Sequence, residues 1–293
     1  MNISLIIVTK DRPKDIIQCL NSAQIQQKKW HQVIIVDASG NSETQRNVEH
    51  FKQTMPIIYT NSDPGITKQR NIGRLLLADD TDVVLFIDDD VELSERTTQQ
   101  LENFFIAHKE AVGVTGYIAG EEPHSTFKRI IGKISLMYTS KIFGITCGLF
   151  NIINSPTELQ KVAWLPGAFM AYRWQSVKDI NFDEWFTTYG LAEDLDFSLQ
   201  VKEVGDLYVD PSIKIVHNHS NVDRNWRRFG KMRVINRRYI RKKHYQGKMC
   251  YWYGYWHATK AMIFINGIRG IYSKRYRDEF FGNVQGINAI IKE

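Results

Sequence analysis

Three consecutive aspartates, Asp88, Asp89 and Asp90, follow a short apolar run of strand-forming residues that starts at residue 82. Carboxylates clustered at the end of a strand repel one another unless a cation or a ligand hydroxyl satisfies them, and a hard divalent metal is the simplest partner. The carboxyl end of a buried strand is also where open α/β sheets bind their ligands. An isolated run of three aspartates is equally compatible with an acidic turn in solvent, so the rest of the chain must decide.

Polar residues also end the neighbouring apolar runs. Asp37 closes the second run, where it could accept a hydrogen bond from a nucleotide base or ribose hydroxyl, or could cap the turn that follows. Thr9, Asp11 and Arg12 end the first run and are expected to border the same crevice. No Gly-rich phosphate-binding loop follows any of these runs, which argues against a dehydrogenase or a P-loop NTPase.

Two later positions could add a base and a metal ligand. Glu193 and Asp194 open an expected helix. Acids are favoured there by the helix dipole, but a carboxylate facing a metal-bound leaving group could also act as a general base. His217 could complete a metal site with two of the aspartates, and His219, two residues further along the same strand face, competes for that role.

The elements that would position these residues alternate between strand and helix. Strands are expected at 3–8, 33–36, 56–59 and 82–87, with helices near 13–23, 43–51 and 72–78. This alternation implies right-handed βαβ units and a mostly parallel sheet, which is open because a closed barrel would need twice as many units. Residues 120–161 are expected to form an irregular connection with short helical pieces. We therefore expect a catalytic domain at 1–222 and a helical region at 223–293.

Length and cysteine content limit the class of protein. A chain of 293 residues fits one large domain with an appendage. Cys19, Cys147 and Cys250 lie far apart and form neither a metal-ligand spacing nor a disulfide framework, which indicates a reducing compartment. The sequence shows no signal peptide and no apolar stretch of transmembrane length, so a cytoplasmic location is expected.

The net charge of +6 is unevenly distributed. Residues 224–248 carry eleven Lys or Arg and no Asp or Glu, so the remainder has a charge of −5. The next residues, 251–256, are densely aromatic. This combination suits an anionic membrane surface or a polyprenyl-diphosphate acceptor, although a solvated helix over an aromatic core is the alternative. Nucleic-acid binding is disfavoured because no recognition motif accompanies the basic residues.

The order of these motifs resembles the family 2 nucleotide-sugar glycosyltransferases of the GT-A fold, over about residues 3–217. The shared features are an Asp after the second strand, Arg-Asn before a helix, D-x-D, a G-A-x-M-A-x-R segment, Glu-Asp opening a helix, and a Pro followed six residues later by His. The resemblance implies an α/β fold with a Rossmann-like, open and mostly parallel sheet flanked by helices, followed by a C-terminal basic and aromatic helical appendage.

The resemblance also implies roles for individual residues. Asp194 resembles the catalytic base, with Glu193 supporting it, and Asp90 resembles the direct metal ligand, with His217 as a late metal or diphosphate contact and Asp88 close to the ribose or a metal-bound water. The residues expected to bind the nucleotide sugar are Thr9, Asp11, Arg12, Asp37, Arg70, Asn71, Asp88, Gly167 and Ala168.

The implied reaction is an inverting transfer assisted by Mg²⁺ or Mn²⁺, from a UDP-, dTDP- or GDP-sugar to a hydroxyl acceptor. The chain lacks the Q-x-x-R-W motif of processive synthases, which favours addition of a single sugar. The expected acceptor is lipid-linked or a polysaccharide in cell-surface glycan assembly, with peripheral association at the inner face of the cell membrane.

Three alternatives stay open at this point. A sugar-phosphate nucleotidyltransferase would need a Gly-rich loop, and residues 7–12 contain no glycine. A non-catalytic membrane-associated scaffold would not need the D-x-D and Glu-Asp pairs. A glycoside hydrolase would use two carboxylates but would not need a nucleotide crevice.

Overall fold

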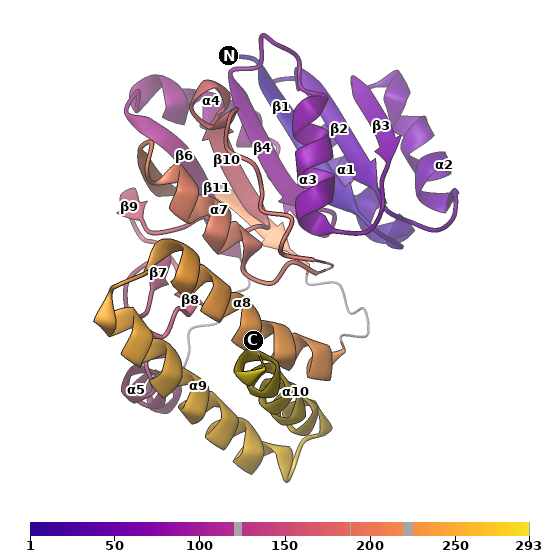
Figure 1. Ribbon diagram of the computed structural model, residues 1–293. Helices are drawn as coiled ribbons and strands as arrows, with labels where there is room; N and C mark the ends of the chain where they lie inside the picture. The colour runs from indigo at the N-terminus through magenta and orange to yellow at the C-terminus, as the bar shows by residue number, and fades with distance from the viewer. Residues whose placement is uncertain (120–124, 188, 219–224, 293) are drawn as a thin grey trace. The chain divides into compact units, whose positions relative to one another are not determined.

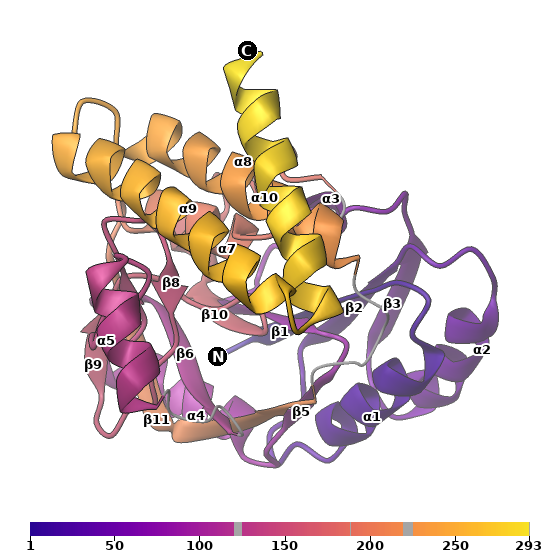
Figure 2. The same cartoon turned by 90° about the horizontal axis from the view of Figure 1, so that it is seen from below.

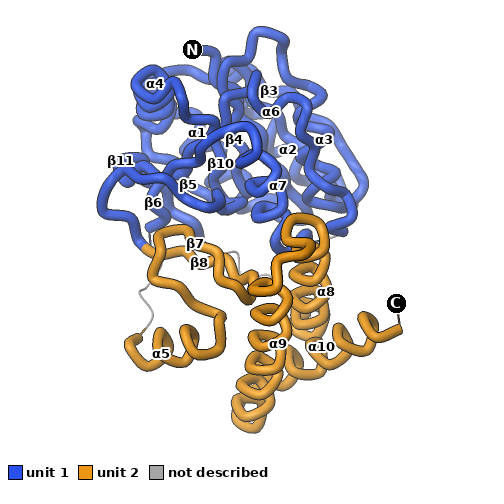
Figure 3. Tube along the Cα trace, turned by 60° about the vertical axis from the view of Figure 1, so that its left-hand side comes forward, with its two compact units in different colours: residues 1–121, 155–220 blue, residues 122–154, 221–293 orange. Residues whose placement is uncertain are grey.

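The computed structural model describes residues 1–119, 125–187, 189–218 and 225–292 (Figure 1). The chain forms two compact units, which Figure 3 distinguishes by colour. The first unit comprises residues 1–121 and 155–220, and the second comprises residues 122–154 and 221–293. The chain passes into the second unit twice, at residue 122 and again at residue 221. The second passage lies beside the boundary expected at 222.

The first unit is built on one mixed sheet with the strand order β3-β2-β1-β4-β10-β6-β11-β5. Strands β1 to β4 are parallel, β10 runs antiparallel to both of its neighbours, and β9 pairs with β11 off this path. The strands are β1 (Ile3–Thr9), β2 (Gln32–Asp37), β3 (Ile57–Asn61), β4 (Val83–Asp88), β5 (Val91–Leu93), β6 (Ala111–Ala119), β9 (Gln160–Val162), β10 (Phe169–Arg173) and β11 (Asp206–His217).

Helices cover both faces of this sheet. Helix α3 lies over one face of β1 and β2, and α1 and α2 lie against the other face (Figures 1 and 2). Strand β1 is buried along its whole length, as expected for a parallel strand between two helical layers. The helices are α1 (Pro13–Gln24), α2 (Glu43–Glu49), the short 3-10 helix η1 (His50–Gln53), α3 (Ile66–Leu75), α4 (Thr97–Ala107), α6 (Trp174–Val177) and α7 (Glu193–Val201).

Local sequence explains how the helices meet the sheet. Pro13 stands at the first helical position of α1, where its fixed φ suits helix initiation. Gly73 of α3 allows close approach, because a Cβ there would lie 2.7 Å from Cγ2 of Ile6 in β1. The expected α/β fold with an open, mostly parallel sheet is confirmed.

The strand register brings the expected site residues to one edge of the sheet. Thr9 at the end of β1 is level with Asp37 at the end of β2, and Asp88 at the end of β4 is level with Val8. His217 ends β11 and pairs with Val91, immediately after the three aspartates. The carboxyl ends of these strands therefore carry the polar groups that the sequence placed there.

The second unit is mostly helical and has a small core of its own. Val234, Tyr255, Met262 and Ile290 form its buried centre. In the described ranges no helix is both long and apolar enough to cross a membrane. The elements of the second unit are α5 (Thr126–Ile134), the hairpin of β7 (Gly144–Ile145) and β8 (Asn151–Ile152), α8 (Trp226–His244), α9 (Met249–Gly270) and α10 (Lys274–Ile291).

Several basic residues of this unit have internal partners. Arg237 is buried, donates to the backbone oxygen of Gly148 at 2.9 Å and lies 4.1 Å from the ring centre of Phe150. Arg233 lies 3.1 Å from the buried carboxylate of Glu279. The basic segment is therefore partly a structural framework and not only a solvated face.

Candidate functional site

Two aspartates and a histidine converge at the carboxyl edge of the sheet. One potential ligand atom from each of Asp88, Asp90 and His217 lies within 4.8 Å of the others. Nε2 of His217 is 3.1 Å from Oδ1 of Asp90. Two carboxylates and an imidazole form a donor set that divalent cations such as Mg²⁺ and Mn²⁺ accept. His219, the competing candidate from the sequence, lies outside the described residues.

The middle aspartate has different partners. Asp89 is buried and accepts hydrogen bonds from Oγ1 of Thr9 at 2.7 Å and from Nη1 of Arg12 at 2.8 Å. Burial raises the pKa of Asp89 to about 7, although Arg12 opposes the rise. Thr9 and Arg12, both expected near the donor, are thus held by Asp89 and connect the end of β1 to the end of β4.

A buried guanidinium links the aspartates to the Glu-Asp pair. Nη2 of Arg70 donates to Oδ1 of Asp88 at 3.1 Å, and Nη1 donates to Oε1 of Glu193 at 2.9 Å. Nη2 also donates to the backbone oxygen of Gly167 at 3.2 Å. Because Arg70 is fully buried, its position in α3 fixes the distance between these two acidic groups.

Asp194 is oriented by two backbone donors. Its Oδ2 accepts from the N–H of Gly167 at 2.9 Å and its Oδ1 from the N–H of Leu195 at 2.7 Å. Ala192, just before α7, has a left-handed φ of 71°, which turns the chain sharply into the helix. This turn places Glu193 and Asp194 side by side at the helix start.

Burial shifts the protonation of this pair. Burial, reinforced by the charge of Asp194, raises the pKa of Glu193 to about 8 even though Arg70 opposes the rise. Burial also raises the pKa of Asp194, against the effect of its two backbone hydrogen bonds. Carboxyl groups with raised pKa values beside a metal-type donor set are typical of sites for proton transfer.

Gly167 leaves little space at the centre of this arrangement. A Cβ at this position would lie 3.0 Å from Nη2 of Arg70 and 3.4 Å from Oε1 of Glu193. The neighbouring Ala168 is buried as well. The small residues of the G-A-x-M-A-x-R segment therefore allow the backbone to pass between the two acidic groups.

Asp37 is fully buried and already has three hydrogen-bond donors. Its Oδ1 accepts from the N–H and Oγ of Ser39 at 2.8 and 2.5 Å, and its Oδ2 accepts from the hydroxyl of Tyr59 at 2.6 Å. Burial and this contact raise the pKa of Tyr59. Asp11 adopts a positive φ of 55° and donates its N–H to Oγ of Ser39 at 2.7 Å. Asp11 and Ser39 therefore lie in the loops that follow β1 and β2, beside Asp37 at the end of β2.

Asn71 is not among the residues that meet around Arg70. Its side chain donates to the backbone oxygen of Phe182 at 2.9 Å and to Oε1 of Glu184 at 3.0 Å, and accepts from the N–H of Phe182 at 2.9 Å. These contacts anchor the segment that leads to α7.

One residue beside the site was not singled out from the sequence. Gln69 is buried, and its Nε2 donates to the backbone oxygens of Thr9 at 2.8 Å and Val36 at 2.9 Å. It holds together the ends of β1 and β2. Little in the sequence pointed to it, because residues 69–71 were expected to precede a helix near 72–78, whereas α3 begins at Ile66.

Comparison with known proteins places this arrangement in context. The protein-family model described as glycosyl transferase family 2 matches residues 4–180. The matched range contains Arg70, Asp88 and Gly167 and ends before Glu193 and His217. None of the curated proteins matches the sequence significantly.

Solved glycosyltransferases share the fold at low sequence identity. The mannosyltransferase PcManGT from Pyrobaculum calidifontis, in complex with GDP-Man and Mn²⁺, matches with a TM-score of 0.60 and 14% identity, over 99% of this chain and 86% of that one. TarS from S. aureus matches with a TM-score of 0.55 and 19% identity, over 91% of this chain but only 43% of TarS. The chain thus spans less than half the length of TarS. At these identities the likeness concerns the fold.

Proposed function

The chain belongs to glycosyl transferase family 2 and has the GT-A fold, and we propose that it is a metal-dependent, inverting enzyme that moves one sugar from a nucleoside-diphosphate sugar to a hydroxyl acceptor. The observation that carries the proposal is the connection made by Arg70. It joins Asp88, one of three residues suited to a metal, to Glu193, which stands beside the partly buried carboxylate of Asp194. A site of this kind brings a leaving-group anchor and a base close together.

The donor set supports a divalent cation. Asp88, Asp90 and His217 would hold Mg²⁺ or Mn²⁺, and PcManGT was solved with Mn²⁺. When bound, the cation would supply positive charge opposite the diphosphate that leaves. Arg70 would hold the carboxylate of Asp88 in place through its hydrogen bond to Oδ1.

Asp194 is the proposed general base. Its two backbone hydrogen bonds fix the carboxylate, while burial raises its pKa and so makes the ionised carboxylate a stronger base. Glu193 is the proposed positioning residue, since it holds Arg70. Attack by the deprotonated hydroxyl on the face opposite the leaving group would invert the anomeric centre.

The nucleotide would lie across the ends of β1 and β2. Asp37, Asp11 and their partner Ser39 lie together there and are proposed to surround the base and ribose, with Gly167 and Ala168 close to the sugar. UDP-, dTDP- and GDP-sugars are the proposed donors. TarS was solved with UDP-GlcNAc and PcManGT with GDP-Man, so both types occur on this fold.

The acceptor is proposed to be a polyprenyl-diphosphate-linked or polysaccharide hydroxyl in cell-surface glycan assembly. The basic second unit supports an anionic acceptor and peripheral association with the cytoplasmic face of a membrane. The absence of Q-x-x-R-W in the sequence supports addition of one sugar per acceptor.

A nucleotide screen tests the proposal directly. The thermal midpoint of the full chain would be measured with UDP, dTDP and GDP, each with and without Mn²⁺. We expect one nucleotide to raise the midpoint, and to do so only with Mn²⁺. If no nucleotide raises it under either condition, the proposed donor site is wrong. The matching donor would then be supplied with candidate acceptors, and NMR of the product would show whether the anomeric configuration is inverted.

A further inference from the structure

Helix α5 in the second unit presents its apolar side chains to solvent. Phe127, Ile130 and Ile134 recur at the spacing of one helix face and are 71, 52 and 70% exposed. Soluble proteins normally turn such a face toward their core. Gly132 is the one residue of α5 that is buried.

Helix α9, which is longer than α5, also exposes large apolar side chains to solvent. Its buried residues, which include Tyr255, Ala258 and Met262, lie on one side. Its exposed side would be expected to carry charges, yet Tyr253 and Phe264 are more than half exposed there. The whole of α9 contains no Asp or Glu, and its charged residues are Lys260 and Arg269.

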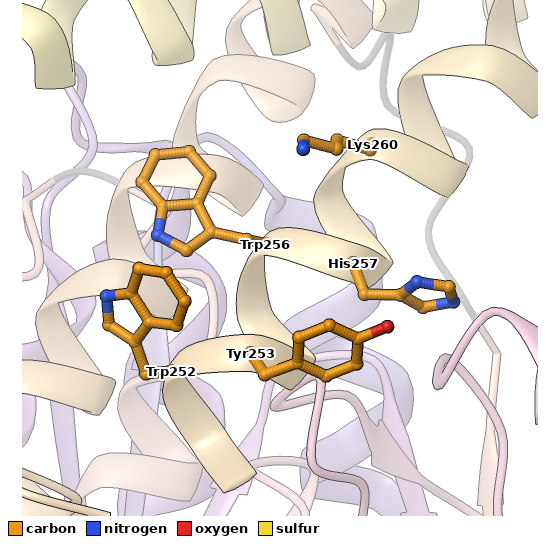
Figure 4. A pocket seen from close by; sticks show the side chains of 5 residues that line it. All are labelled: Trp252, Tyr253, Trp256, His257 and Lys260. Carbon is orange, nitrogen blue, oxygen red and sulfur yellow. The ribbon is translucent and has the colours of Figure 1, made fainter. Parts of the chain in front are cut away.

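The two helices meet at the carboxyl end of α5. Nε2 of His257 lies 2.9 Å from the backbone oxygen of Ile134, and the ring of Tyr253 stacks on His257 with 5.7 Å between ring centres. Figure 4 shows the side chains of α9 that line a recess of about 530 Å³. The recess is lined by Trp252, Tyr253, Trp256, His257 and Lys260. We call the surface formed by Phe127, Ile130, Ile134 and this recess the α5–α9 face.

The unit that carries this face is strongly positive. The second unit contains 21 Lys or Arg and five Asp or Glu, a formal charge of +16, whereas the first contains 17 and 27, a charge of −10. On α5 itself the charged residues are Lys128, Arg129 and Lys133, all basic and exposed. An apolar stripe flanked by cations fits an anionic partner.

We propose that the α5–α9 face is a docking surface for an anionic lipid membrane. Phe127, Ile130 and Ile134 would enter the boundary between headgroups and acyl chains, with α5 lying in the plane of the membrane. The basic side chains of α5 would contact anionic headgroups, and Trp252 and Tyr253 would lie at headgroup depth, where such rings are enriched. A second copy of the chain fits this surface less well, because two such positive faces would repel each other.

The proposed function includes peripheral association with a membrane, and this inference assigns that association to the α5–α9 face. It rests on the proposed function in this respect only. Vesicle binding is measured without donor or acceptor. Failure of membrane docking and failure of sugar transfer are therefore observed separately.

The test is flotation of the full chain with vesicles of phosphatidylcholine alone and of equal parts phosphatidylcholine and phosphatidylglycerol. We expect binding to the anionic vesicles only. The double variant Phe127→Ser/Ile130→Ser should weaken that binding by roughly 100-fold, since two large apolar side chains no longer leave water. The matched control is Ile106→Ser in α4 of the first unit, an isoleucine that is 58% exposed and should bind as the wild type does.

A second variant keeps the test valid if the first one folds poorly. Lys128→Gln/Lys133→Gln changes only exposed side chains and should also lose binding to anionic vesicles. Equal binding to both kinds of vesicle, or wild-type binding by a folded Phe127→Ser/Ile130→Ser variant, would overturn the proposal. So would a dimer in light scattering that the α5 variant disrupts while no vesicle is bound, because the face would then join two copies of the chain.

Discussion

The first unit carries a formal charge of −10 and the second carries +16, and the two units use charge in different ways. In the first unit, acidic groups gather at one edge of a sheet, where a single buried arginine holds Asp88 and Glu193. In the second unit, buried cations such as Arg237 stabilise the helices from inside, while apolar side chains remain outside. The proposed catalytic site therefore concentrates hydrogen-bonded acidic groups in one place, whereas the proposed docking surface combines distributed positive charge with exposed apolar area.

Removing the proposed base from the first unit should have the largest effect on sugar transfer. Asp194→Asn keeps the shape of the side chain but removes its ability to take a proton, so kcat should fall by about 10³-fold while donor affinity stays unchanged. Single-turnover kinetics and donor titration measure the two effects. Asp206→Asn, which changes an exposed aspartate of the same unit, is the control and should have little effect. Near-normal turnover by Asp194→Asn would show that the base lies elsewhere.

The metal site should give the next largest effect. Removing divalent cations with a chelator, or replacing Asp90 by Asn, should reduce transfer by roughly 100-fold or more, because charge on the leaving diphosphate is no longer neutralised. Mn²⁺ at 100 times its dissociation constant should stabilise the wild type by about 2.7 kcal/mol, and the Asp90 variant much less. Full activity in excess chelator contradicts the assignment.

Two buried ion pairs, one in each unit, allow a matched test of stability. Arg70→Met leaves Asp88 and Glu193 without their shared cation and should lower the free energy of unfolding by about 3–5 kcal/mol, together with activity. Arg233→Met should cost less, about 1–3 kcal/mol, because Glu279 keeps Arg275 as a partner at 3.2 Å. Urea unfolding and transfer assays measure both variants. If Arg233→Met also abolishes transfer, catalysis is not confined to the first unit.

The smallest expected effect is on pH dependence. A base must be ionised to accept a proton, so kcat/KM should fall as the pH falls through the pKa of Asp194. Burial raises that pKa, so the loss should begin at a higher pH than the ordinary aspartate value of 3.8 would give. A pH profile measured with saturating metal shows the midpoint. An acid limb at or below the ordinary aspartate range would mean that another group takes the proton.

Much of the first unit could be predicted because its signals are local. Strands β1 to β4 are continuous apolar runs separated by helix-length segments, and parallel strands bring their carboxyl ends to one edge. Asp37 and Asp88 were therefore placed at the same edge before their contacts were known. The convergence of His217 on Asp90 joins distant chain segments, so the sequence left His217 and His219 as competing ligands, and the resemblance favoured His217.

What the sequence did not reveal depends on tertiary packing. Antiparallel insertion of β10 between β4 and β6 leaves no mark in an apolar run interrupted by small residues. Gln69 and Tyr59 look like ordinary polar residues until the strand ends they contact are in place. The exposure of Phe127 could not be predicted for a similar reason, because an amphipathic pattern does not show whether the apolar side of the helix is covered.

The position of β10 has a consequence for how the chain folds. Residues 169–173 fill the gap between β4 and β6, which end at residues 88 and 119. During synthesis the sheet of β3, β2, β1 and β4 can form early, but the outer edge of β4 stays unpaired until more than half of the chain has been made. An unpaired strand edge invites association with other chains. Nascent chains that stop before residue 169 should therefore aggregate more readily than chains that extend beyond it.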